Sequence, residues 1–222
     1  MVKKIFLIAA LSVFASLLKA QQEEIPDAKA KAVIEALSKK AKTYKTIKAD
    51  FTIVVYDRNK QPGDPQKGSL CSKGAKYRLD IKSQTVICDS ATTWTYLKDA
   101  NEVQINNVES DPDKGNISPA TIFTIYEKGF KSHWDGETKN GAETMEVIDL
   151  YPKHPEREKY HTLKLTINKE KDAVEEILVM MKDGTTVKYT VNSFSPNTTL
   201  SPGTFTFNSK DYPGVEVEDL RN

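Results

Sequence analysis

Cysteine and histidine are scarce in this sequence, which has two cysteines and three histidines in 222 residues. His133, His154 and His161 do not have the spacing of metal ligands, and no G-x-S-x-G nucleophile elbow occurs. Cys71 and Cys88 do not form a C-x-x-C redox motif. We therefore expect no catalytic residue, no bound metal and no cofactor, and we predict that the protein is not an enzyme.

The acidic loop at residues 111–116 begins like a calcium-binding loop. Its glycine, Gly115, comes one position too early, and Ile122 stands where a bidentate glutamate is required. We interpret this loop as a solvated connection.

A cysteine is also absent after the apolar start of the chain. Lys3 and Lys4 precede an apolar run at residues 5–18, and Ala20 follows, as in a secretory signal peptide. The run is short for a membrane span, and the polar stretch at 21–24 argues against an uncleaved anchor. A bacterial lipoprotein would need a cysteine directly after the cleavage point. We expect a signal peptide at 1–20 and a soluble, unanchored product outside the cytoplasm.

An excess of charge of either sign is missing as well. The chain has 32 Lys and Arg against 31 Asp and Glu, and removal of three signal-peptide lysines leaves 29 against 31. A net charge near −2 argues against nucleic acid as a partner. The sequence shows no internal repeat and no low-complexity linker, so we expect residues 21–222 to form a single domain.

Two cysteines in an exported protein raise the question of a disulfide. Cys71 and Cys88 lie in two expected strands, with a third expected strand at 77–82 between them. Strands lie about 4.8 Å apart, so these residues would exceed the roughly 7 Å Cα limit for a disulfide. We predict two free, half-buried thiols.

Periodicity predicts one long helix followed by many strands. Asp27 is a good N-cap, and apolar residues then recur at helical spacing up to Tyr44. Alternation with a period of two marks the expected strands. They are 51–55, 68–72, 77–82, 85–88, 93–97, 103–105, 143–151, 160–167, 174–181, 186–194, 204–208 and 215–218.

A second helix is expected after the acidic loop, with Ser118 as N-cap and Pro119 at the first helical position. We expect it to extend to Phe130. About eleven short antiparallel strands with so few helices favour a nearly closed sheet, with the helices at one mouth or on the concave side. The expected fold class is mainly β.

Apolar side chains alternate with charged ones on several strands. In residues 76–82, Tyr77, Leu79 and Ile81 alternate with Lys76, Arg78 and Asp80, so one face is dry and the other wet. The dry face must be buried against helices, against the sheet itself or against a ligand. Periodicity alone does not separate a filled core from a cavity.

Several stretches, in order along the chain, resemble the periplasmic lipoprotein carrier family LolA. They are 46–52, 67–70 leading to 77–79, 88–96, 150–153, and 205–207 with 213–217. The resemblance implies an incomplete antiparallel β-barrel of about eleven strands, with an α-helical lid over a hydrophobic cavity that receives lipoprotein acyl chains.

Site residues follow from this resemblance by position. Inward-facing cavity positions are matched by Phe51, Ile53, Tyr77, Leu79, Ile81, Trp94 and Tyr96. Lid positions are matched by Val33, Ile34, Leu37, Ile122, Phe123 and Tyr126. Many relatives have an arginine-proline pair before the aromatic strand, associated with holding the lid closed, whereas residues 73–75 here contain no arginine. Arg78 alternates to the face opposite Tyr77, so it does not replace the missing arginine.

The resemblance also implies the partners. They are acylated lipoproteins, an inner-membrane lipoprotein-releasing ABC transporter and an outer-membrane acceptor, met by a monomeric carrier in the periplasm. The alternatives are a carrier or sensor for another lipid such as a glycolipid or pigment ester, a periplasmic enzyme with polar groups in a cleft, and a β-domain with a filled interior that binds protein.

Overall fold

The computed structural model describes residues 27–108, 125–127 and 129–221. These residues contain one α-helix, four short 3₁₀ helices and twelve strands. The helices are α1 (Ala28–Ala41), η1 (Ile125–Glu127), η2 (Pro155–Arg157), η3 (Pro202–Phe205) and η4 (Ser209–Asp211). The strands are β1 (Ile47–Tyr56), β2 (Gln66–Lys73), β3 (Lys76–Ile81), β4 (Gln84–Cys88), β5 (Thr92–Leu97), β6 (Glu102–Asn107), β7 (Phe130–Asn140), β8 (Glu143–Pro152), β9 (Tyr160–Asn168), β10 (Ala173–Met181), β11 (Thr186–Pro196) and β12 (Glu216–Asp219).

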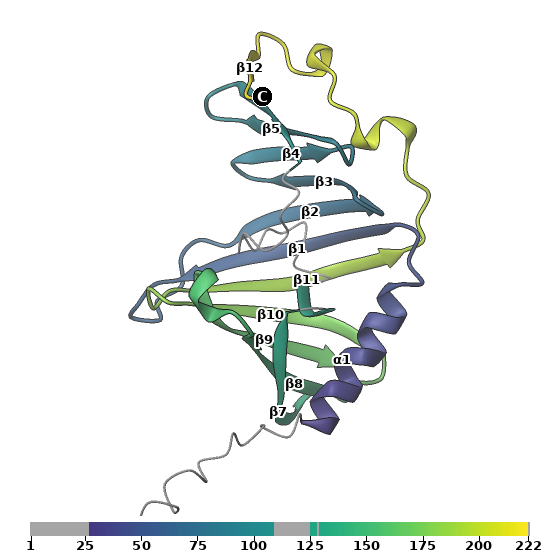
Figure 1. The fold of residues 1–222 in the computed structure, drawn as a ribbon, viewed down its shortest axis with the longest axis vertical. Coiled ribbons are helices and arrows are strands. Elements are labelled where there is room, and N and C mark those ends of the chain that lie inside the picture. The colour runs from purple at the N-terminus through teal and green to yellow at the C-terminus, as the bar shows by residue number, and fades with distance from the viewer. Residues whose placement is uncertain (1–26, 109–124, 128, 222) are drawn as a thin grey trace, which may run out of the picture.

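All twelve strands belong to one open sheet (Figure 1). Their order is β12-β6-β5-β4-β3-β2-β1-β11-β10-β9-β8-β7, so β12 and β7 are edges and the sheet does not close. Neighbours are antiparallel except that β12 runs parallel to β6. The prediction of a mainly β fold with an incomplete sheet is confirmed, and the sheet is mixed because its last strand is parallel.

Two expected elements are wrong. Phe130, expected at the end of a helix, begins the edge strand β7, which has a bulge between Trp134 and Gly136 and was not predicted. The expected strand at 204–208 is replaced by η3 and a short extended stretch. Pro202 at the start of η3 favours the helical turn, and Phe205 is buried without a strand partner. Residues 118–124 of the expected second helix lie outside the described residues.

The position of α1 is fixed at its first turn. Asp27 Oδ1 accepts hydrogen bonds from the backbone N–H groups of Lys29 at 3.1 Å and Ala30 at 3.0 Å, as expected of an N-cap. Its other oxygen, Oδ2, accepts from the Trp134 N–H of β7 at 2.6 Å. Lys29 Nζ lies 3.3 Å from the centre of the Trp134 ring, within cation–π range. The cap therefore also attaches the helix to the sheet edge.

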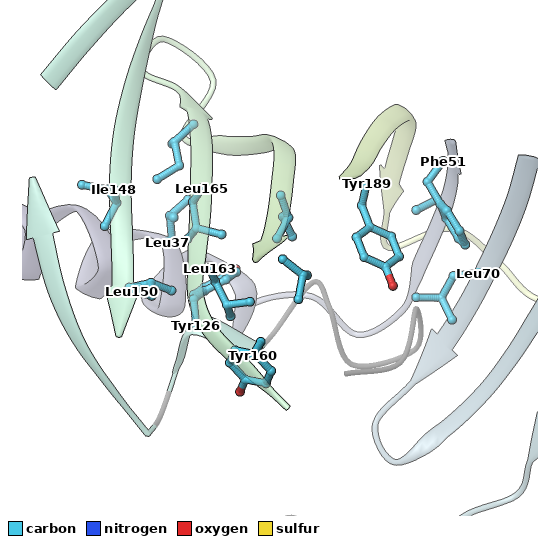
Figure 2. Close-up of a cluster of buried hydrophobic side chains, with 14 of the residues drawn as sticks. Leu37, Phe51, Leu70, Tyr126, Ile148, Leu150, Tyr160, Leu163, Leu165 and Tyr189 are labelled. Atoms are coloured by element: carbon cyan, nitrogen blue, oxygen red, sulfur yellow. The ribbon is translucent and has the colours of Figure 1, made fainter. Parts of the chain in front are cut away.

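One face of the sheet, called here the helix face, carries Ile47, Ala49 and Phe51 and packs against α1. Leu37 of α1 is buried in the same cluster as Ile148, Leu150, Leu163 and Leu165 of β8 and β9 (Figure 2). Figure 1 shows α1 beside the part of the sheet formed by β7–β11. Apolar burial at about 25 cal/mol per Å² is the main stabilisation of this packing.

The C-terminal segment, residues 202–215, runs from β11 back to the far edge (Figure 1). Its aromatic side chains pack on the opposite face of the β3–β6 part. Trp94 stacks on Phe207 with ring centres 6.4 Å apart, and Tyr96 meets Tyr212 at 4.5 Å. Phe205 is 8% exposed. The sheet thus has a second, smaller apolar core on the face away from α1.

The pH dependence of stability tests the α1 attachment. Hydrogen bonds from the backbone N–H groups of Ala30 and then Trp134 lower the pKa of Asp27 below its ordinary value of 3.8. A carboxyl with a lowered pKa stabilises the fold above its ordinary pKa, and this contribution is lost as the pH falls through the lowered value. We expect Asp27→Asn to be less stable than the wild type at neutral pH, with the difference shrinking below pH 3.8.

Urea unfolding at neutral and at acidic pH measures this difference. Glu35→Gln is the matched control because Glu35 is an exposed carboxylate of the same helix, paired only with exposed Lys31 among the described residues. A stability gap for Asp27→Asn that is equal at both pH values would contradict the assignment.

The C-terminal segment yields a second prediction. Half-buried Phe207 contacts Trp94 and Tyr212, and an aromatic pair contributes about 0.5–1.5 kcal/mol beyond area burial. We expect Phe207→Ala to lower the free energy of unfolding by about 1–3 kcal/mol. Urea unfolding followed by Trp fluorescence measures the loss. Stability equal to that of the wild type would show that the segment does not brace the sheet.

Candidate functional site

The strand registers bring five of the predicted cavity residues onto the helix face. Ala49 is aligned with Leu70, and Leu70 with Leu79. Phe51 is aligned with Gly68, and Gly68 with Ile81. The five predicted residues and two neighbours, Leu70 and Val86, form what is called here the apolar layer. Its members are Phe51, Ile53, Leu70, Tyr77, Leu79, Ile81 and Val86.

A glycine makes room inside this layer. A Cβ at Gly68 would lie 2.5 Å from the Phe51 ring and 3.0 Å from Ile81, which is too close for any side chain at this position. The Phe51 ring therefore lies directly over β2 and is only 1% exposed. Figure 2 shows Phe51 beside Leu70, with Tyr189 of β11 next to them. The absence of a side chain at Gly68 thus sets the position of Phe51, the largest fully buried side chain in the layer.

Tyr77 and Leu79 differ in their surroundings. Leu79 is 2% exposed, whereas Tyr77 is only partly buried. Burial raises the pKa of Tyr77, with a smaller contribution from Cys88 beside it. The phenol therefore stays neutral over the physiological pH range, and the layer has no ionised group at this position.

An apolar pocket lies at one end of the layer, between the C-terminal end of α1 and the sheet. Its empty volume is about 430 Å³, including space open to solvent. The lining residues are Leu37, Ala41, Tyr44, Ile47, Tyr126, Asp172, Ala173, Val174 and Phe194. The rings of Tyr44 and Phe194 are 5.5 Å apart. Burial, followed by the nearby Asp172 carboxylate, raises the pKa of Tyr44, so this side chain is also neutral.

The connection from α1 to β1 holds this pocket in shape. Asn197, just after β11, has a positive φ of 59° and accepts a hydrogen bond through Oδ1 from the Lys45 N–H at 2.8 Å. The Asn197 N–H donates to the Thr46 carbonyl at 2.7 Å, and the Thr46 hydroxyl donates to the Thr198 carbonyl at 2.7 Å.

Sequence reasoning missed Tyr44, Ile47, Val174 and Phe194 as site residues, since only the docking of α1 brings them together.

The predicted lid residues have three different locations. Leu37 is buried, and Val33 and Ile34 of α1 are half-buried against the same core. Tyr126 lies in η1, is buried, and borders the pocket. Ile122 and Phe123 lie outside the described residues.

Trp94 and Tyr96 lie on the face opposite the apolar layer, so their prediction as cavity residues does not agree with the registers. Trp94 is aligned with Ile87, and Ile87 with Arg78, whereas Tyr77 is aligned with Cys88. The turn between β4 and β5 determines which face each β5 residue takes. Alternation within β5 gives no information on that choice. The partners of these rings, Phe207 and Tyr212, come from the C-terminal segment.

Arg78 lies on the expected face, and both cysteines are free as predicted, but Cys88 is buried rather than half-buried. Arg78 lies opposite Tyr77 and its Nε donates to Asp80 Oδ2 at 2.9 Å. Cys71 is aligned with Arg78, and Cys88 with Tyr77. The two thiols are therefore on opposite faces and two strands apart, and both are free.

The three histidines lie in different parts of the described structure. His133 lies 3.4 Å from Asp27, His154 3.5 Å from Glu156, and His161 contacts Thr162. Within the part of the chain that the structure describes, no group of three or more His, Cys, Asp or Glu side chains could hold a metal ion. The acidic loop at 111–116 lies outside that part.

Among the described residues, α1 is too short and too polar to cross a membrane, and the 3₁₀ helices are shorter still.

Several solved structures are similar to this chain. An uncharacterized conserved protein from Thermus thermophilus is similar with a TM-score of 0.55 at 13% identity, over 87% of this chain and 99% of that one. LprF from Mycobacterium bovis has a TM-score of 0.49 at 12% identity, over 80% and 98%. A putative outer membrane lipoprotein-sorting protein domain from Vibrio parahaemolyticus has a TM-score of 0.45 at 10% identity, over 80% and 97%.

No curated protein matches the sequence. The family model described as outer membrane lipoprotein carrier protein LolA matches residues 42–208, about three quarters of the 222 residues. This range begins after α1 and includes the whole sheet except β12. On this match, the chain belongs to the LolA family.

Proposed function

We propose that this protein is a periplasmic carrier that binds the acyl chains of lipoproteins and transports them from the inner to the outer membrane. The observation that supports it best is the apolar layer on the helix face, which continues across four strands toward the pocket beside α1. An acylated lipoprotein has long hydrocarbon chains that must be kept from water in transit. The family match supports the same proposal.

In this proposal, the acyl chains lie against Phe51, Ile53, Tyr77, Leu79 and Ile81. The helix α1 acts as part of a lid through Val33, Ile34 and Leu37. Because these three side chains already pack on the sheet core, a chain that enters beneath the helix exchanges lid contacts for lipid contacts. The carrier is then stable both empty and loaded.

The affinity of such a carrier has a physical upper limit. Burial of a methylene contributes about 0.8 kcal/mol, so full burial of two or three long chains would exceed the roughly 20 kcal/mol ceiling on noncovalent affinity. A carrier that bound so tightly would not release its cargo. Partial burial, with α1 competing for the same apolar surface, keeps the affinity in a range that allows transfer.

The partners in this proposal are an inner-membrane lipoprotein-releasing ABC transporter, which loads the carrier, and an outer-membrane acceptor, which receives the cargo. Export would occur by way of the signal peptide expected at residues 1–20, followed by folding of residues 21–222 as one monomeric domain. A carrier of this kind needs no catalytic residue.

One pair of variants on β1 tests the proposal. Ile53 lies in the apolar layer, whereas its neighbour Val54 is half-buried on the opposite face, aligned with Lys188. We expect Ile53→Gln to weaken binding of a fluorescent triacylated lipopeptide about tenfold, because it removes roughly one apolar side-chain contact of about 1.5 kcal/mol. Val54→Gln should bind like the wild type. Equal affinity of both variants would refute the site.

A direct search for cargo completes the test. Purification of the protein from detergent-solubilised envelopes, followed by mass spectrometry of bound molecules, should recover acylated lipoproteins. Recovery of a glycolipid or pigment ester in their place would indicate a carrier for another lipid. Phe207→Ala, whose change lies on the opposite face, should retain its cargo.

A further inference from the structure

We infer that β5 and β6 carry a polar subsite on the helix face that binds the ester and amide groups linking acyl chains to a neutral peptide. The subsite, called here the polar strip, consists of Thr93 and Thr95 of β5 with Gln104 and Asn106 of β6. This inference rests on the proposed function and gives the bound lipid a direction: chains toward β1, linkage toward β6.

The registers place the polar strip in line with the apolar layer. One row runs from Tyr77 to Cys88 and then to Thr93 and Asn106, and the next runs from Leu79 to Val86 and then to Thr95 and Gln104. Both rows therefore change from apolar to polar between β4 and β5, on the same face. Five inter-strand steps of about 4.8 Å separate β1 from β6, about 24 Å in all, so one long amphiphile reaches both parts.

The polarity of the strip is not a general property of β5 and β6. Val103 of β6 is 0% exposed on the opposite face, where Trp94 and Tyr96 pack against the C-terminal segment. The apolar side chains of β5 and β6 thus lie on the face opposite the helix face, whereas those of β1–β3 lie on the helix face. If this face bound only hydrocarbon, apolar residues at the strip positions would increase the affinity, because each apolar contact buries more apolar surface.

Hydrogen-bonding capacity is available in the strip. Gln104 Nε2 donates to Glu102 Oε1 at 2.8 Å, which leaves the Gln104 amide oxygen as an acceptor. Tyr77 and Thr93 share a side-chain hydrogen bond. Among the described residues, neither the Thr95 hydroxyl nor the Asn106 side-chain amide has a hydrogen-bond partner, although both residues are half-buried.

The chemistry of these groups selects a neutral linkage. Hydroxyl and amide groups both donate and accept, which suits ester carbonyls, amide carbonyls and amide N–H groups together. All four side chains of the strip are uncharged, and Glu102 at its border is engaged by Gln104. A phosphate head group would favour Arg or Lys at these positions.

Variants with matched controls on the same strands test this inference. Thr95→Val with Asn106→Ala removes the two side chains without a partner. Thr92→Val with Asn107→Ala makes the same changes on the opposite face, since Thr92 is aligned with Asn107. The two probes are a triacylated lipopeptide and a fluorophore-tagged hydrocarbon chain that lacks ester and amide groups. Binding is measured by fluorescence titration of the folded variants, with folding checked by circular dichroism.

The expected result is a loss specific to the polar probe. The first double variant should bind the lipopeptide about tenfold more weakly than the wild type, because two hydrogen bonds are lost. It should bind the hydrocarbon probe with the same affinity as the wild type. The control double variant should bind both probes like the wild type. An equal loss for both probes, or no loss for the lipopeptide, would overturn the polar strip and leave the proposed function intact. A wild type that binds neither probe would overturn both.

Discussion

The alternation of side chains along each strand is the constraint on which the rest of this structure depends. An open sheet has two faces, and every strand must present one residue to each in turn. The described segments that cover these faces are α1, at the β7–β11 part of the helix face, and the C-terminal segment, at the β3–β6 part of the opposite face. The apolar layer of β1–β4 lies on the helix face, next to the part that α1 covers, and this is where we place the ligand.

The attachment of α1 depends mainly on contacts at its two ends. Its first turn is held to the edge strand by Asp27 and Lys29, which both contact Trp134. Its last turn leads into a connection held to the end of β11 through Asn197. Between these two ends, the helix packs on the sheet core through buried Leu37 and half-buried Val33 and Ile34. Apolar contacts are non-directional, so in the proposed function lipid chains could replace them without leaving polar groups unpaired.

Much of the fold was predictable because hydrophobic periodicity has a direct physical cause. The helix cap at Asp27 and the strands from β1 to β6 follow from local patterns, and the alternation around Tyr77 and Leu79 identified their face correctly. The edge strand β7 was missed because it pairs on one side only and has few apolar residues besides Phe130 and Trp134. Phe205 and Phe207 suggested a strand, but Phe205 lies in η3, and the Phe207 ring stacks on Trp94 of β5.

The sequence by itself determined the class of the fold, the number of strands to within one, the family, and the apolar character of one face of β1–β3. The fold class, the strand number and the apolar face depend on residues close together in the chain, and the family depends on the order of short stretches along it. Only the tertiary structure decided that Trp94 and Tyr96 face away from Tyr77, that Tyr44, Ile47 and Phe194 form a pocket, and that Thr95 and Asn106 continue the rows of the apolar layer. These features depend on the path of each turn and on which distant segment covers which face, and local periodicity contains no information on either.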